Sequence, residues 1–137
     1  MNIQREMSTL FGNACYAFTI AWIYSEPEIR DNIIYLTYDV IQGLTNDFIE
    51  MDGFVKAPHK YANMCIGEKT FKDVEKVKIS SLDDLPVKGT FAVEFNYGTK
   101  KHFVACEKGK VVFDPWENSE TVKYGKPTSY RKFIPAN

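Results

Sequence analysis

Residues 102–114 read HFVACEKGKVVFD. Two apolar runs, 103–106 and 111–113, flank a turn signal formed by Lys108 and Gly109. Apolar runs of this length on either side of a lysine-glycine step are typical of two antiparallel strands joined by a tight turn. The segment therefore predicts a β-hairpin, and the hairpin indicates a sheet in the second half of the chain.

The length of this turn determines how two polar residues at the base of the hairpin, His102 and Asp114, meet. A three-residue loop 107–109, with Gly109 in the left-handed conformation, makes them cross-strand neighbours on one face. A two-residue loop instead puts His102 opposite Pro115 and next to Asp114 on the diagonal. A carboxylate beside an imidazole fixes its tautomer and stabilises the imidazolium. An ordinary histidine–aspartate contact at the edge of a sheet is the alternative interpretation.

The character of the chain changes near Gly67, from helical periodicity before it to alternating strands after it. The expected helices are one capped by Asn13 and stopped by Pro27, one capped by Asp31 with Ile34, Thr37, Ile41 and Leu44 on one face, and a short one between Pro58 and Gly67. The expected strands cover 74–79, 90–96, 103–106, 111–113, 121–124 and 130–134. Helices followed by an antiparallel meander predict an α+β domain with its helices packed on one side of a sheet.

Composition narrows the classes of protein. The 137 residues are 45% hydrophobic and 15% aromatic, which suits one domain, 1–137, with a buried core. The net charge is −1, so the chain lacks the large positive field that binds a nucleic-acid backbone, and a nucleic-acid partner is disfavoured. The longest apolar stretch, 14–24, is too short to span a membrane. The N-terminus does not read as a secretory signal, which predicts a cytoplasmic protein at synthesis; later release, phage association and oligomeric state stay open.

The cysteines suit neither a disulfide framework nor a zinc site. There are three, Cys15, Cys65 and Cys106, at wide spacings, and the only histidines are His59 and His102. Disulfide frameworks use even numbers of cysteines, and zinc sites usually bring closely spaced pairs. We therefore expect free thiols, no metal and no cofactor.

Cys15 is the cysteine whose position suits nucleophilic chemistry. With Asn13 as the cap, it falls in the first turn of a predicted helix. The thiolate is the reactive form, and the partial positive charge of a helix N-terminus favours it. The unpaired amides of the same turn can donate to an oxyanion. The alternative is a buried structural thiol, which is common in helices.

These residues resemble papain-like cysteine peptidases of the C39 kind. The segments that carry the resemblance are 13–17 (NACYA), 102–106 (HFVAC) and 111–116 (VVFDPW), and 53–58 leading to 65–67 is similar to small phage and bacterial relatives. The resemblance implies a papain-like fold in which Cys15 is the nucleophile, His102 its base and Asp114 the group that orients the histidine. It also implies an amide substrate, in a peptide or a peptidoglycan cross-link, and no cofactor.

The chain departs from that family at the expected oxyanion donor. A glutamine usually stands five or six residues before the cysteine, where this chain has Thr9 and Leu10. Gln4 lies farther upstream and Asn13 is the nearer amide, so these two are the candidate donors. Two other classes of protein stay open: a binding or regulatory module that keeps the scaffold with weak or no catalysis, and a structural domain in which Cys15 belongs to the core.

Overall fold

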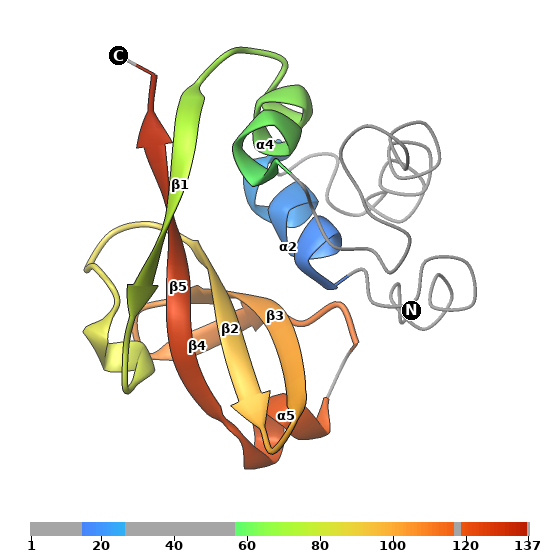
Figure 1. Cartoon of the computed structure of the whole chain (residues 1–137), viewed down its shortest axis with the longest axis vertical. Coiled ribbons are helices and arrows are strands. Elements are labelled where there is room, and N and C mark those ends of the chain that lie inside the picture. Colours follow the sequence, from blue (N-terminus) through green and yellow to red (C-terminus); the bar gives the residue numbers. More distant parts are fainter. Residues whose placement is uncertain (1–14, 27–56, 117–118, 137) are drawn as a thin grey trace.

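The computed structural model describes residues 15–26, 57–116 and 119–136. Figure 1 shows an α+β arrangement, in which helices α2 and α4 lie on one side of an antiparallel sheet and a short helix, α5, lies at one end. The helices are α2 (Cys15–Tyr24), α4 (Pro58–Ile66) and α5 (Glu120–Tyr124), with a 3-10 turn η2 (Leu82–Asp84). The strands are β1 (Phe71–Lys78), β2 (Phe91–Tyr97), β3 (Lys100–Glu107), β4 (Lys110–Phe113) and β5 (Lys126–Pro135). The coarse α+β prediction is therefore confirmed.

The order of the strands differs from the predicted meander. The sheet runs β1-β5-β2-β3-β4, so only β2, β3 and β4 follow one another as hairpins, and β5 returns to lie between β1 and β2. All neighbouring pairs are antiparallel. The alternation of apolar residues in 130–134 predicted a strand correctly, but periodicity does not specify which strands it pairs with.

The segment 121–124 is helical, so the strand predicted there was wrong. Ser119 caps α5, because its hydroxyl oxygen accepts a hydrogen bond from the backbone N–H of Val122 at 3.3 Å. A capping serine satisfies one of the free amides of the first turn and so favours a helix over a strand. Gly125 ends the helix where a Cβ atom would collide with the carbonyl oxygens of Thr121 and Asn96. Local capping thus outweighs the strand propensity of these residues.

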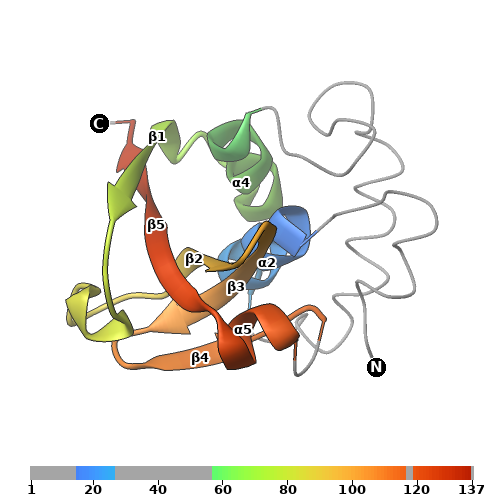
Figure 2. The same cartoon turned by 60° about the horizontal axis from the view of Figure 1, so that its bottom comes forward.

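The sheet is curled (Figure 2). Its two faces carry separate apolar cores. One core is built from Leu85, Val93, Phe95, Val104, Cys106 and Tyr130. The other joins Ala92 and Phe103 of the sheet to Cys15 of α2. Consecutive strand residues point to opposite faces, which explains why Phe103 and Val104 belong to different cores. The face that carries Phe103 is the one that receives α2.

Helix α4 confirms the predicted short helix. It begins at Pro58 and is followed by Gly67 in the left-handed conformation, with φ of 88°. Proline suits the first turn of a helix and glycine the position after its end. The helix predicted from Asp31 and the cap predicted at Asn13 lie outside the described residues. No helix in the described part of the chain is long and apolar enough to cross a membrane.

Candidate active site

Helix α2 lies against the edge of β3 just beyond the point where β4 stops pairing. The register of β4 with β3 covers only Ala105 to Glu107 of β3, which leaves Phe103 without a strand partner on that side. The Phe103 N–H donates to Cys15 Sγ at 3.3 Å, and the Thr19 hydroxyl donates to the Phe103 carbonyl at 3.2 Å. Cys15 and Thr19 are one helical turn apart, so one face of α2 satisfies both backbone groups. This contact holds the sulfur at the edge of the sheet.

A β-bulge brings Asp114 to the face of β3 that carries His102. Cys106 pairs with Val111 and Ala105 pairs with Phe113, so Val112 is an extra residue in β4. The loop is the two-residue one, because Glu107 pairs with Lys110. Without the bulge, that loop would place Asp114 opposite Phe103, on the other face. The extra residue shifts the pairing of the later β4 residues with β3 by one position. A shift of one position moves a side chain to the opposite face of the sheet, so Asp114 lies on the face of His102.

The predicted three-residue loop was therefore wrong, but the contact that it predicted is present. His102 Nε2 lies 2.7 Å from Asp114 Oδ1. The His102 imidazole also interacts with the side chain of Cys15. Because Nε2 faces the carboxylate, Nδ1 is the ring nitrogen that remains for the sulfur. Cys15, His102 and Asp114 form a continuous chain of contacts from α2 to the end of β4.

Asp114 is fixed by more than the histidine. Its Oδ1 also accepts from the Trp116 N–H at 2.9 Å, and its Oδ2 accepts from the Ser119 N–H at 3.2 Å. Burial alone would raise the pKa of Asp114, but the hydrogen bond and charge of His102 and the two backbone amides outweigh burial and lower it. The carboxylate is therefore ionised at neutral pH and has a fixed orientation.

His102 is held in its protonated form by its two neighbours. Burial lowers the pKa of His102, but hydrogen bonds to Asp114 and Cys15, together with their negative charges, outweigh burial and raise the pKa to about 9. An imidazole with this pKa is an imidazolium at pH 7. The imidazolium of His102 is therefore the positive charge of the site, beside the carboxylate of Asp114.

The three cysteines have different surroundings, and all are free. Cys106 is fully buried, and burial together with the charge of Asp114 raises the pKa of its thiol to about 12. Burial also raises the pKa of Cys65 to about 12. Of the three, Cys15 is the one in contact with the imidazole of His102, although only 3% of its surface is exposed. Cys106 therefore belongs to the core of the domain.

A buried ion pair lies beneath the start of α2. The Tyr16 and Phe103 rings are stacked with centroids 4.2 Å apart, and the Arg131 guanidinium lies 5.0 Å from the Phe103 ring. Arg131 pairs with Glu94 at 3.7 Å, and their side chains are 14% and 9% exposed. Burial raises the pKa of Tyr16 above its usual range, and the charge of Arg131 partly offsets that rise. These contacts fix Phe103, whose backbone in turn holds Cys15.

Breaking this ion pair is expected to destabilise the fold. Arg131→Met should lower the free energy of unfolding by about 3 kcal/mol, because it leaves the Glu94 carboxylate buried without its partner. The double variant Glu94→Gln/Arg131→Met should lose less than the sum of the two single changes. Urea unfolding measures both effects, with the exposed neighbour Lys132→Met as the control. Equal losses for Arg131→Met and Lys132→Met would contradict the expectation.

The structure brings together three of the predicted site residues and leaves two outside its description. Cys15, His102 and Asp114 meet, whereas Asn13 and Gln4, the candidate oxyanion donors, lie outside the described residues. Within residues 15–26, 57–116 and 119–136, His, Cys, Asp and Glu side chains form no group of three placed to hold a metal ion. The chemistry available at this site is that of a thiol, an imidazole and a carboxylate.

Sequence reasoning missed the residues that support the site. Thr19 carried a signal, because it is a polar residue one turn after Cys15 in an apolar helix. The signal for Glu94 and Arg131 was weaker: each is a charged residue within a predicted strand. Ser119, which caps α5 and donates to Asp114, was not recognised as a cap. The role of the Phe103 backbone had no signal, because it depends on where β4 ends.

Comparison with known proteins does not assign the chain. It matches no protein-family model, and it has no significant match among curated proteins or solved structures. The function of the chain is therefore inferred from the geometry of Cys15, His102 and Asp114.

Proposed function

We propose that this protein is a cysteine hydrolase of papain-like fold that cleaves an amide bond in a peptide or a peptidoglycan cross-link. The observation that carries the proposal is the chain of contacts Cys15–His102–Asp114. A nucleophile in contact with a base, and a base oriented by a third group, is the arrangement common to triad hydrolases.

The reaction follows from the roles of the three groups. The proton of Cys15 resides on His102, which is an imidazolium at neutral pH, and the sulfur attacks the carbonyl carbon of the amide to form a tetrahedral intermediate. As the C–N bond breaks, the His102 imidazolium gives its proton to the leaving amine, and a thioester remains on Cys15. His102 then takes a proton from water, the resulting hydroxide attacks the thioester, and the carboxylic acid leaves as the thiol is restored. Asp114 keeps Nε2 protonated throughout, so that Nδ1 exchanges the proton.

Selective labelling of Cys15 tests the proposal directly. At pH 7 iodoacetamide should modify Cys15 faster than Cys65 or Cys106, because burial raises the pKa of both other thiols to about 12. Mass spectrometry of peptides from the labelled protein gives the rate at each cysteine. Unfolding in urea should remove the difference. Equal rates at all three cysteines in the folded protein would reject the hydrolase.

The protonation of His102 gives a second, independent test. His59→Gln leaves His102 as the one histidine in the chain, so its imidazole proton resonances can be followed by NMR without assignment. The midpoint of the His102 titration should lie near pH 9, above the unperturbed pKa of histidine, which is about 6.5. Since the folded pKa is raised, this group stabilises the fold fully below about pH 6.5, and the contribution is lost as pH rises through about 9. Amide hydrolysis should fall over the same upper range, because the imidazolium is the acid. A midpoint near 6.5 would contradict the raised pKa of His102 and its role as the acid at neutral pH.

One observation favours a second candidate, a papain-like binding or regulatory module with little catalysis. Only 3% of Cys15 and 5% of His102 is exposed, and a nucleophile must be reached by its substrate. The two candidates differ in turnover. Rapid labelling of Cys15 without cleavage of a peptide library or of purified peptidoglycan would favour the module.

A further inference from the structure

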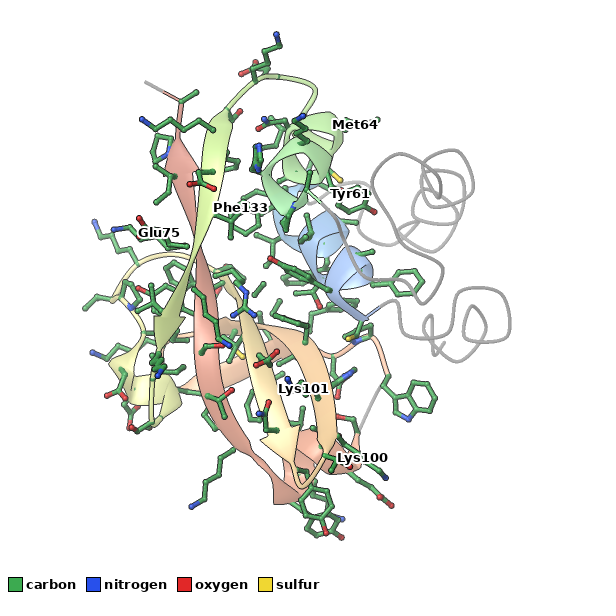
Figure 3. The ribbon with its side chains drawn as sticks, viewed as in Figure 1. Tyr61, Met64, Glu75, Lys100, Lys101 and Phe133 are labelled. Carbon is green, nitrogen blue, oxygen red and sulfur yellow. The ribbon has the colours of Figure 1, made fainter. Side chains whose placement is uncertain are left out.

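A cavity of about 730 Å³ opens between α4, the α4–β1 connection and the end of β5. It is lined by His59, Lys60, Asn63, Met64, Gly67, Glu68, Lys69, Phe71, Lys72 and Ala136. Figure 3 shows Met64 on α4 at one end of the molecule and Lys101, which precedes His102, in the opposite half. The cavity is therefore separate from the triad, and its volume falls in the range of small-molecule sites, about 300 to 1,000 Å³.

Two large apolar side chains, Met64 and Phe71, belong to the lining of the cavity, and we call them its apolar floor. Met64 is 49% exposed, so its side chain is available to a ligand. Phe71 is held from behind by the rings of Tyr24 and Phe133, whose centroids lie 5.2 and 5.4 Å away. Asn63 joins α4 to the start of β1, because its Oδ1 accepts from the Phe71 N–H at 2.8 Å and its Nδ2 donates to the Phe71 carbonyl at 2.8 Å. The walls are thus formed before any ligand arrives.

The rim of the cavity is positively charged. Lys60, Lys69 and Lys72 surround the apolar floor, and Glu68 is the one carboxylate in the lining. None of the three lysines has an ion-pair partner within the described part of the chain. The whole chain has a net charge of −1, so this local excess of positive charge is not a property of the surface in general. An anion at the rim would meet unpaired ammonium groups.

We propose that this cavity binds a monoanionic amphiphile, specifically a free long-chain carboxylate. The alkyl chain lies on Met64 and Phe71, and the carboxylate sits among the ammonium groups of Lys60, Lys69 and Lys72. An apolar floor contributes free energy in proportion to the methylenes that it covers. The lysines select an anionic head group over a neutral or cationic one. The proposal does not depend on the hydrolase activity, because the two sites share no residue.

Calorimetric titration of the intact protein with dodecanoate, below the concentration at which it forms micelles, tests the proposal. Saturable binding of one equivalent is expected. Shortening the ligand to decanoate should weaken its binding by about fourfold for each methylene removed, because each methylene covered by the cavity contributes to the binding free energy. Dodecyltrimethylammonium, which has the same chain and a cationic head, should not bind. Absence of saturable dodecanoate binding, or equal binding of the two head groups, would overturn the proposal.

Charge reversal at the rim locates the site. Lys69→Glu/Lys72→Glu should weaken dodecanoate binding at least tenfold, whereas Lys76→Glu, an exposed lysine of β1 outside the lining, should leave it within about twofold. Met64→Ser should weaken the binding of dodecanoate more than the binding of decanoate. Circular dichroism of each variant separates a lost site from a lost fold. Equal affinities for the double variant and the Lys76→Glu control would reject this cavity as the site, as would saturable binding of acidic peptides with none of dodecanoate.

Discussion

His102→Ala should reduce the rate of amide hydrolysis on the order of 10⁴-fold, the largest single loss that we expect. The variant loses the base for Cys15, the acid for the leaving amine and the base for water in one change. Labelling of Cys15 at pH 7 should fall less, about 30-fold, because a free thiol of pKa near 8.5 is still about 3% thiolate at that pH. The labelling rate of the variant should then rise steeply toward pH 9, as for an ordinary thiol.

The matched control is His59→Ala, which removes the other histidine of the chain, on α4 and outside the triad. It should change neither hydrolysis nor the labelling of Cys15 by more than about twofold, the scatter expected of a change outside the site. Unfolding measurements on both variants identify any effect that comes from stability alone. A His102→Ala variant that is labelled at Cys15 as fast as the parent protein would show that the imidazole does not activate the sulfur.

Asp114→Asn should lower hydrolysis by a similar order, about 10³- to 10⁴-fold, while the fold is retained. In the parent protein both carboxylate oxygens accept: Oδ1 from His102 and Trp116, and Oδ2 from Ser119. An amide has one oxygen for these donors. If its NH₂ group turns to His102, it forces the proton onto Nδ1, where the imidazole can no longer take one from Cys15. If it turns to Ser119, two donors face each other in a half-buried site.

The pKa of His102 in the Asp114→Asn variant distinguishes a carboxylate that acts on the imidazole from one that only supports the fold. Loss of the carboxylate charge should bring the pKa of His102 down from about 9, since Asp114 contributes both a hydrogen bond and a charge that raise it. NMR titration in the His59→Gln background measures the change. The control is Asp73→Asn, an exposed carboxylate of β1. An unchanged titration of His102 in Asp114→Asn would show that the carboxylate does not act on the imidazole.

The contacts around Phe103 explain how an apolar helix holds the sulfur of Cys15 at the edge of β3. Its backbone N–H and carbonyl are bound by Cys15 and Thr19, and its ring is covered by Tyr16 and Arg131. Each of these contacts fixes the distance between α2 and β3, and hence between the sulfur and the imidazole. A site of this kind is more precise on a helix and a strand than on loops.

Several features of the fold could be predicted from local patterns. Proline at 58 and glycine at 67 bound α4, and the runs around 91–97, 103–106 and 111–113 are strands, because backbone preferences and side-chain alternation act over a few residues. The order of Cys15, His102 and Asp114 along the chain indicated which residues meet at the candidate site. The segment 121–124 was mistaken for a strand because a single serine, Ser119, outweighs the propensities of the residues that follow it.

The geometry of the site could not be read from local patterns. The two-residue loop by itself would turn Asp114 away from His102, and the bulge at Val112 turns it back. Whether a strand accommodates an extra residue depends on the twist and pairing of the whole sheet, and no short segment contains that information. The placement of β5 between β1 and β2, which brings Arg131 to Phe103 and Glu94, likewise depends on contacts distant in sequence. The chemical groups were thus visible in the residues, whereas their meeting depended on how separate segments pair.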